Sequence, residues 1–470
     1  MRILPASLKS PPAVKLSLIR KRLLCAGYAM FLKATRPHLL KMGNNKNKEF
    51  EKITLDNGLR VILAPMGGFK SASAIVLCGA GSRYETKKTI GLSHFLEHMF
   101  FKGTKKRPTA MKVAAEIDAM GGVNNAFTSK EYTGYFIKAA SIHIEHILEI
   151  LADMLHNSLF KAQEFERERN VILQELHMRH DDPKIRVLDL IEEVVLGRNQ
   201  PLGWDTGGYP QIIQKQTREQ MVNYVGERYF PNNIILAVAG SYERGAVLGA
   251  IQKYFGLSKP RKVANFLPYI DKQKKFQIGI ERRKIRQAAV AVAFKGVSRF
   301  DDDKYALDVL ATVLGGGMSS RMFDEVREKR GLAYYIKTGC EYYHDTGVLV
   351  TFGGIDPPKV EEALKVIAGE YARIRDEKVG EKELSKAKES IKGQLALAFE
   401  DSLNVAQFYG FGELLENKIE TFNEEISHID AVGAQDIKRA AGRLIRRDKM
   451  SLALVGPFGD GARFGKIVEV

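Results

Sequence analysis

Two short apolar stretches decide the fold, Asn233-Ile-Ile-Leu-Ala-Val-Ala-Gly240 and Met450-Ser-Leu-Ala-Leu-Val-Gly456. Each is a bounded apolar run of the kind that forms a buried strand. The Leu-Ala pair and the closing glycine of the first stretch recur in the second, 216 positions later. The same offset relates Ser82-Arg83-Tyr84 to Ser298-Arg299-Phe300. Two separated segments that keep one offset indicate an internal duplication, and therefore two halves of similar fold.

The duplication divides the 470 residues into two homologous domains, at residues 42–258 and 276–470. Residues 259–275 between them are rich in Lys and are expected to be a linker. Strands and helices do not alternate strictly, so we predict an α+β fold in which each half has a mainly antiparallel sheet with packed helices. Strands are expected at Arg60–Ala64, Ser73–Cys78, Ile234–Ala239 and Gly347–Phe352, and helices at Ile142–Leu155, Gln163–His180, Lys304–Leu314 and Glu381–Leu397.

The net charge of +16 is unevenly distributed, because residues 1–41 hold nine Lys and Arg and no acid. The remaining body carries only +7 and lacks clusters of basic and aromatic residues, which argues against a nucleic-acid binder. The apolar run Leu23–Leu32 is too short to span a membrane, so no transmembrane segment is expected. The basic leader at 1–41 is a targeting segment, an extension upstream of a start at Met42, or a disordered tail.

The cysteine count excludes a disulfide scaffold. Cys25, Cys78 and Cys340 lie far apart and leave one thiol unpaired. Their spacing also excludes a cysteine-ligated zinc site. A reducing compartment is therefore the expected location of the protein.

The chemistry is concentrated in residues 91–100, Gly-Leu-Ser-His94-Phe-Leu-Glu97-His98-Met-Phe. On a helix, His94 and His98 are one turn apart and point from the same face, so that they can share one zinc ion. Glu97 lies beside them, where it can take a proton from a metal-bound water. Ser93 is expected to cap this helix. A pair of helical histidines is commonly structural, but the added acid at fixed spacing favours a metal site.

The duplication supports a metal site in the first half alone. The offset of 216 places Leu310, Val313 and Leu314 where the first half carries its two histidines and its glutamate. A polar trio that served only the architecture would be expected in both halves. One half is therefore equipped for chemistry and the other is not.

A catalytic zinc usually takes a third protein ligand and leaves one position for water. The helical stretch Glu166–His177 offers Glu168 and Glu175, which are seven residues apart and share a face, whereas His177 points elsewhere. From composition alone, a solvated charged helix explains this stretch better than a metal site does. The residues alone leave the third ligand open.

Four segments resemble blocks of one known family, in the order of that family, and the resemblance extends over about residues 50–460. They begin at His94-Phe-Leu-Glu97-His98, Gly121-Gly-Val-Asn-Asn125, Glu166-Arg-Glu-Arg-Asn and Arg327-Glu-Lys-Arg-Gly. The sequence thus resembles the pitrilysin/insulinase superfamily of zinc peptidases, whose signature is His-x-x-Glu-His. Within it, the sequence is most similar to the processing-peptidase branch and its bacterial single-gene relatives.

The resemblance implies a zinc metalloendopeptidase that hydrolyses extended peptides or presequences and holds one Zn²⁺ per chain. It implies His94, His98 and Glu175 as the zinc ligands. Glu168 is implied as a supporting carboxylate behind them, and Glu97 as the general base that acts on a zinc-bound water.

The resemblance also assigns substrate-binding residues in both halves. The residues Asn125, Ala126, Phe127 and Thr128 resemble an edge strand that pairs with an extended peptide. Arg327 and Tyr334 of the second half resemble a pair that reaches the substrate and the tetrahedral intermediate, which makes them catalytic candidates.

The family encloses its substrate between four such domains, so a chain with two implies a dimer. A homodimer is expected, with a heterodimer of related subunits as the alternative. A catalytically inactive core-like subunit is the competing function, against which the intact motif argues. The block Pro201-Leu-Gly-Trp-Asp205 favours a bacterial-type cytoplasmic protein over one of the mitochondrial matrix.

Overall fold

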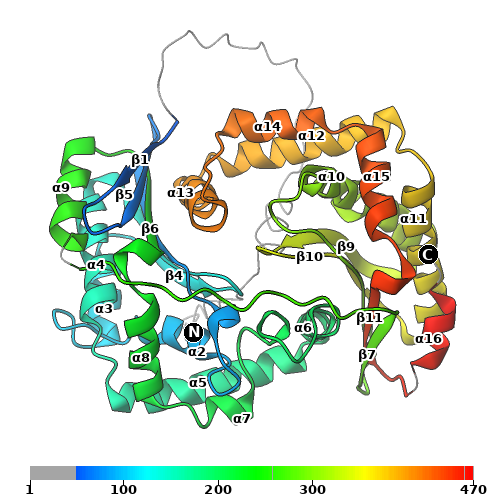
Figure 1. Cartoon of the computed structure of the whole chain (residues 1–470), viewed down its shortest axis with the longest axis horizontal. Coiled ribbons are helices and arrows are strands. Elements are labelled where there is room, and N and C mark those ends of the chain that lie inside the picture. The colour runs from blue at the N-terminus through cyan, green and yellow to red at the C-terminus, as the bar shows by residue number, and fades with distance from the viewer. Residues whose placement is uncertain (1–48, 257, 460, 469–470) are drawn as a thin grey trace, which may run out of the picture.

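The computed structural model describes residues 49–256, 258–459 and 461–468. The predictions for the leader at 1–41 and for Cys25 lie outside these residues. The described chain forms two halves that lie side by side, each built around one sheet (Figure 1).

The sheet of the first half has six strands in the order β1-β2-β6-β3-β5-β4. Their bounds are β1 Glu51–Thr54, β2 Arg60–Pro65, β3 Ser71–Cys78, β4 Val123–Thr128, β5 Thr133–Ala140 and β6 Ile234–Gly240. All neighbours pair antiparallel except β2 and β6. The central strand β3 is buried along nearly its whole length because both faces of the sheet are covered.

The sheet of the second half has five strands in the order β7-β11-β8-β10-β9. Their bounds are β7 Gln277–Arg282, β8 Ala288–Lys295, β9 Ala333–Tyr342, β10 Gly347–Ile355 and β11 Met450–Gly456. Here too a single pair, β7 and β11, is parallel.

The two sheets have the same topology once β1 is set aside. The repeated stretches of the sequence are β6 and β11, and each lies between the parallel partner and the central strand of its sheet. The expected α+β fold with two mainly antiparallel sheets is confirmed, as are the strands and helices expected from the residue pattern.

Helices cover both sheets. In the first half they are α2 Leu92–Met99, α3 Ala110–Ala119, α4 Ile144–Asn157, α5 Ala162–Asp181, α6 Pro183–Leu196, α7 Pro210–Ile213, α8 Arg218–Arg228 and α9 Arg244–Phe255. In the second half they are α10 Lys304–Gly315, α11 Val360–Asp376, α12 Glu381–Ala398, α13 Ser402–Phe411, α14 Phe422–Ala431, α15 Ala434–Leu444 and α16 Ala462–Ile467.

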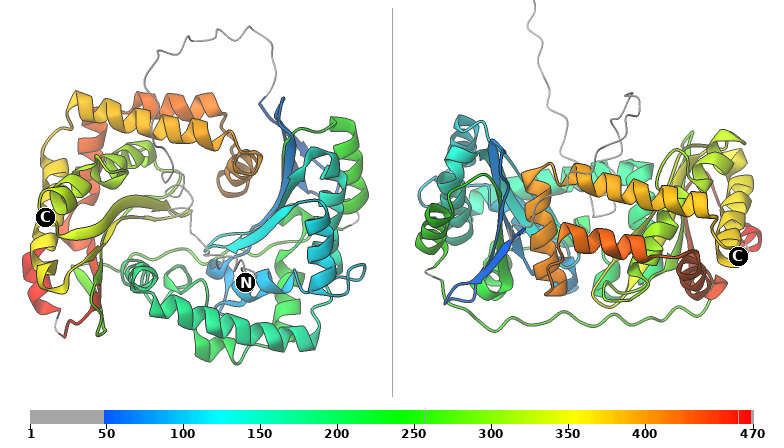
Figure 2. Two further views of the ribbon diagram at one scale, coloured as in Figure 1. Left: turned by 180° about the vertical axis from the view of Figure 1, so that it is seen from behind. Right: turned by 90° about the horizontal axis from the view of Figure 1, so that it is seen from above.

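The two halves exchange one helix each. Helix α6 of the first half packs on β7, β8 and β11 of the second sheet, where Leu190 and Ile191 are fully buried. Helix α13 of the second half packs on β2, β3 and β6 of the first sheet, through Val405 and Tyr409 among others. The two helices occupy equivalent places in the duplicated order (Figures 1 and 2). Each half therefore completes the core of the other.

Residues 259–275, where the sequence predicts a linker, contain no helix or strand and cross from the first half to the second (Figure 2). The segment is anchored on the way, since Ile270 N–H donates to Gln200 and Tyr269 N–H donates to Asp345. Among the described residues, no helix has the length and apolar character required to cross a bilayer.

Candidate metal centre

Helix α2 carries the His-x-x-Glu-His motif and begins at Gly91, whose φ of 88° is in the left-handed region that favours glycine. The Glu85 carboxylate caps this helix, because it accepts from the backbone N–H groups of Gly91 and Ser93, each at 2.7 Å. The prediction that Ser93 is the cap is wrong. Ser93 lies inside the first turn, and its hydroxyl is hydrogen-bonded to the Tyr224 hydroxyl instead.

The two histidines of α2 converge on Glu175 of α5. His94 Nε2 lies 3.6 Å from Glu175 Oε1, and His98 Nε2 lies 3.3 Å from Glu175 Oε2. One ligand atom of each residue falls within 4.8 Å of the other two. A tetrahedral zinc with bonds of about 2.0–2.1 Å has ligand atoms about 3.3 Å apart. The donor set and its spacing therefore fit one zinc ion.

Glu168 lies two helical turns before Glu175 on α5 and contacts the other ring nitrogen of His98. His98 Nδ1 is 2.8 Å from Glu168 Oε1, which orients the ring so that Nε2 faces Glu175. Lys102 Nζ lies 2.5 Å from the second oxygen of Glu168. Burial raises the pKa of a carboxyl, but the hydrogen bonds from His98 and Lys102 outweigh it and hold the pKa of Glu168 below its usual range. Glu168 is therefore an anion at neutral pH.

Glu97 points from α2 toward the end of β4. Its side chain is buried, and its Oε2 accepts a hydrogen bond of 2.7 Å from the Thr128 hydroxyl. Thr128 is the last residue of the edge strand β4. Two residues that the sequence analysis named separately, Glu97 and Thr128, are thus in direct contact.

The rest of the predicted substrate strand is partly exposed and partly buried. Phe127 is buried, and its ring packs near Tyr132 and near Phe411 of α13. The Ala126 N–H donates to the side-chain oxygen of its own neighbour Asn125, at 2.9 Å. Strand β4 pairs with β5 on one side and forms the edge of the sheet on the other.

Arg327 and Tyr334 lie near each other. The Arg327 guanidinium is 4.6 Å from the ring of Phe323 and 5.8 Å from the ring of Tyr334. Tyr334 is 75% exposed. The contacts of Arg327 are thus with neighbours in the sequence, including Glu328, rather than with the residues of α2.

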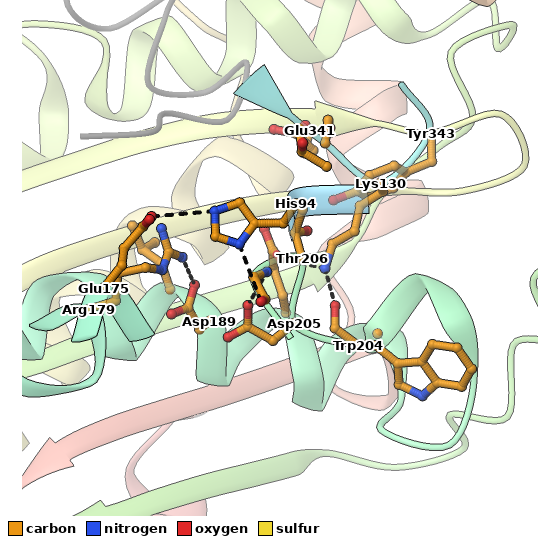
Figure 3. A pocket seen from close by; sticks show the side chains of 16 residues that line it. His94, Lys130, Glu175, Arg179, Asp189, Trp204, Asp205, Thr206, Glu341 and Tyr343 are labelled. Atoms are coloured by element: carbon orange, nitrogen blue, oxygen red, sulfur yellow. Dashed lines mark hydrogen bonds and ion pairs between the residues drawn. The ribbon is translucent and has the colours of Figure 1, made fainter. Parts of the chain in front are cut away.

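A polar pocket adjoins His94 and Glu175 (Figure 3). Besides His94 and Glu175, its charged lining consists of Lys130, Arg179, Asp189, Glu192, Asp205 and Glu341. Burial, reinforced by the neighbouring Asp205, raises the pKa of Asp189 to about 7. Burial lowers the pKa of a lysine, but the carboxylates of Glu192 and Asp205 outweigh it and raise the pKa of Lys130. Acids outnumber bases among the residues that line the pocket.

The sequence prediction missed most of this pocket. Its charges come from five places: the turn after β4, α5, α6, β9 and the loop that contains Trp204. The Trp204 carbonyl accepts from Lys130. The block Pro201–Asp205 was the one available signal, because it joins a tryptophan to an acid within a tight segment. His177 is not part of the ligand cluster, as the helical spacing predicted.

A second group of possible ligands, Glu116, His146 and Glu149, surrounds a guanidinium. Arg107 Nη2 lies 2.7 Å from Glu116 Oε2 and also contacts Glu149. Because the buried Arg107 already pairs with both carboxylates, this group is an ion-pair cluster rather than a metal centre.

Two equivalent halves around a His-His-Glu cluster, with a glutamate beside it at an edge strand, define a class of metal-dependent peptidase folds. The family described as insulinase (peptidase family M16) matches residues 60–204, and the family described as peptidase M16 inactive domain matches residues 215–391. The chain belongs to this family of peptidases.

Relatives and solved structures agree with this assignment. The uncharacterized zinc protease YmxG of Bacillus subtilis is 34% identical over 411 residues, which covers 87% of this chain and 99% of the relative. An uncharacterized zinc protease of Streptomyces coelicolor is 31% identical over 431 residues and covers 90% of this chain and 93% of the relative. The crystal structure of a Helicobacter pylori protease superposes with a TM-score of 0.82 at 25% identity, over 87% of this chain and 99% of that one.

Proposed function

We propose that this chain is a zinc metalloendopeptidase that hydrolyses peptide bonds in extended peptides. One observation carries the proposal: the Nε2 atoms of His94 and His98 converge on the Glu175 carboxylate within 4.8 Å, with Glu97 on the same helix. Three donors of this kind suit zinc and leave a position for water, as catalytic zinc sites require.

Zinc in this site would polarise the scissile carbonyl and make a water molecule more acidic. The chain's own residues supply the proton transfers. Glu97 accepts the proton of the attacking water and then delivers it to the leaving amide nitrogen. The Thr128 hydroxyl donates to one oxygen of Glu97 and so orients the carboxylate for this task. Glu168 holds the His98 ring in the orientation that presents Nε2.

The substrate is proposed to lie along β4 as an added strand. An edge strand offers backbone donors and acceptors to a peptide of any sequence, and the enzyme would therefore require an extended substrate. The pocket beside His94 is proposed to accept a basic side chain of that peptide, because its lining contains carboxylates besides that of Glu175.

The division of labour between the halves belongs to the same proposal. Residues 42–258 would form the peptidase domain and residues 276–470 a homologous domain without metal ligands. Arg327 and Tyr334 are proposed to act on substrate from a second copy in a homodimer, since their contacts in this chain are with their own neighbours. A cytoplasmic location and a heterodimer with a related subunit stay predictions.

The test is metal analysis combined with cleavage of a quenched, unstructured peptide by the purified chain. We expect about one zinc per chain, activity that is lost with a chelator, and recovery on adding zinc. Glu97→Gln should keep its zinc and lose activity, whereas His98→Ala should lose both. A zinc-loaded chain that cleaves no peptide would instead favour the inactive, core-like subunit.

A further inference from the structure

Four charged side chains meet in the interior where the two halves join. Arg83 Nη1 donates to Glu131 Oε1 at 2.6 Å, and Arg83 Nη2 donates to Asp345 Oδ2 at 2.5 Å. Arg299 contacts the other oxygen of Glu131. Arg83, Glu131 and Arg299 are each at most 7% exposed. Two arginines balance two acids, so the cluster is neutral and its buried charges are paired.

The cluster contains one pair of residues that the duplication relates to each other. Arg83 and Arg299 are the equivalent residues of the repeated tripeptides, and they reach the Glu131 carboxylate from opposite halves. Glu131 lies in the turn between β4 and β5, and Asp345 lies in the turn between β9 and β10. The backbone N–H of His344, in the second turn, donates to Glu131 at 3.0 Å. The cluster therefore ties one turn of each half to the other.

The turn that holds Glu131 begins directly after Thr128, the residue that donates to Glu97. Ser129 N–H donates to Tyr132 C=O at 2.8 Å and closes the turn. The N–H of Arg83 donates to Lys130 C=O, also at 2.8 Å, so the same arginine fixes the backbone of the turn as well as its side chain. A side chain at Gly81 would lie 2.5 Å from the carbonyl oxygen of Ser129, which shows how closely the two segments are packed.

We infer that Glu131 is a positioning residue for Glu97, and that Arg299 lets the second half set the geometry of the first half's proposed catalytic site. This inference rests on the proposed peptidase function. The paired charges fix the turn, the turn fixes the Thr128 hydroxyl, and that hydroxyl orients the carboxylate of Glu97. Since misplacement of a reacting group by about 1 Å costs on the order of 100-fold in rate, a loosened turn should lower kcat.

The experiment compares Arg299→Met with Arg439→Met in the full-length zinc-loaded protein. Arg439 also pairs with a buried acid of the second half, Asp303, but it lies on α15, away from the turn. We expect Arg299→Met to lower kcat by about tenfold with normal zinc content and little change in KM, and Arg439→Met to leave kcat unchanged. Arg299→Lys keeps the charge and should recover much of the rate.

A double-variant cycle separates positioning from general stability. Thr128→Val removes the hydroxyl through which Arg299 is inferred to act. In that background Arg299→Met should lower kcat much less than it does alone. An equal loss of kcat in both backgrounds would overturn the inference, because it would show that Arg299 acts without the Thr128 contact.

Hydrogen exchange tests whether Arg299 fixes the turn at residues 128–132, and it does not depend on peptidase activity. Arg299→Met should speed amide exchange in residues 128–132, and Arg439→Met should not. If Arg299→Met fails to fold, the comparison is made with Arg299→Lys, for which a smaller increase in the same segment is expected. Unchanged exchange there refutes the positioning role, whereas a wild-type chain that cleaves no peptide refutes the proposed function alone.

Discussion

Replacing Glu168 tests the metal centre without touching a ligand. Its carboxylate accepts from His98 Nδ1 at 2.8 Å and lies 2.5 Å from Lys102 Nζ. That first contact fixes the tautomer of His98, since a proton held on Nδ1 leaves Nε2 to bind the metal. Loss of such a partner typically weakens metal binding by about 10–100-fold, or about 1.4–2.7 kcal/mol.

Two substitutions of Glu168 should give losses of zinc affinity at the two ends of this range. Glu168→Gln keeps an acceptor for Nδ1–H but loses the negative charge, so we expect about a tenfold weaker affinity for zinc. Glu168→Ala removes the acceptor as well and leaves the Lys102 ammonium without its closest anion, so about a 100-fold loss is expected.

The assay is a competition titration of zinc between the protein and a chromophoric chelator at neutral pH. Glu166→Gln is the matched control, because Glu166 lies on the same helix, is exposed and pairs with Arg169. Zinc affinity of Glu168→Ala equal to that of the wild type would refute the assignment of Glu168, and equal affinity of His98→Ala would refute the whole site.

Three further predictions follow from the packing, the helix cap and the proposed dimer. Leu190→Ala should cost about 2–5 kcal/mol of unfolding free energy, and hydrogen exchange should rise first in β8 of the other half, because Leu190 packs on that sheet. Burial raises the pKa of Glu85 to about 7, so the folded state holds the Glu85 proton more tightly than the unfolded state does. The unfolding free energy should therefore fall by about 3 kcal/mol as pH rises from 4.5 to 7. This fall should be absent in Glu85→Gln. A refolded equal mixture of Glu97→Gln and Tyr334→Phe chains should regain roughly a quarter of wild-type activity if the tyrosine acts across a twofold dimer, and none if it acts within its own chain.

The local part of the site could be predicted from the sequence because a helix fixes it. Residues four apart on α2 share a face in any fold, so His94 and His98 were expected to converge before any tertiary contact was known. The spacing of Glu168 and Glu175 likewise placed both on one face of α5, and both now contact His98. Which of the two would face the metal depends on how α5 packs on α2, and spacing alone contains no such information.

The missed features depend on contacts between distant segments. The apolar face of an amphipathic helix predicts burial but not the partner, and α6 packs on the sheet of the other half. Ser93 has a side chain of the kind that often caps helices, but the Glu85 carboxylate, eight residues earlier in the chain, caps α2 instead. The pocket charges Lys130 and Asp189 come together in space only because the turn after β4 faces α6.

The second half has a physical reason to exist even though it lacks the ligands. Its helix α10 carries Leu310, Val313 and Leu314 at the positions of the motif, and each is at most 3% exposed. Apolar residues there avoid the desolvation cost that the first half offsets with ion pairs and hydrogen bonds around its histidines. In return the second half covers the first sheet with α13. A first half on its own would expose that face of its sheet, including Ile75, so the chemically equipped half depends on its sister for its core.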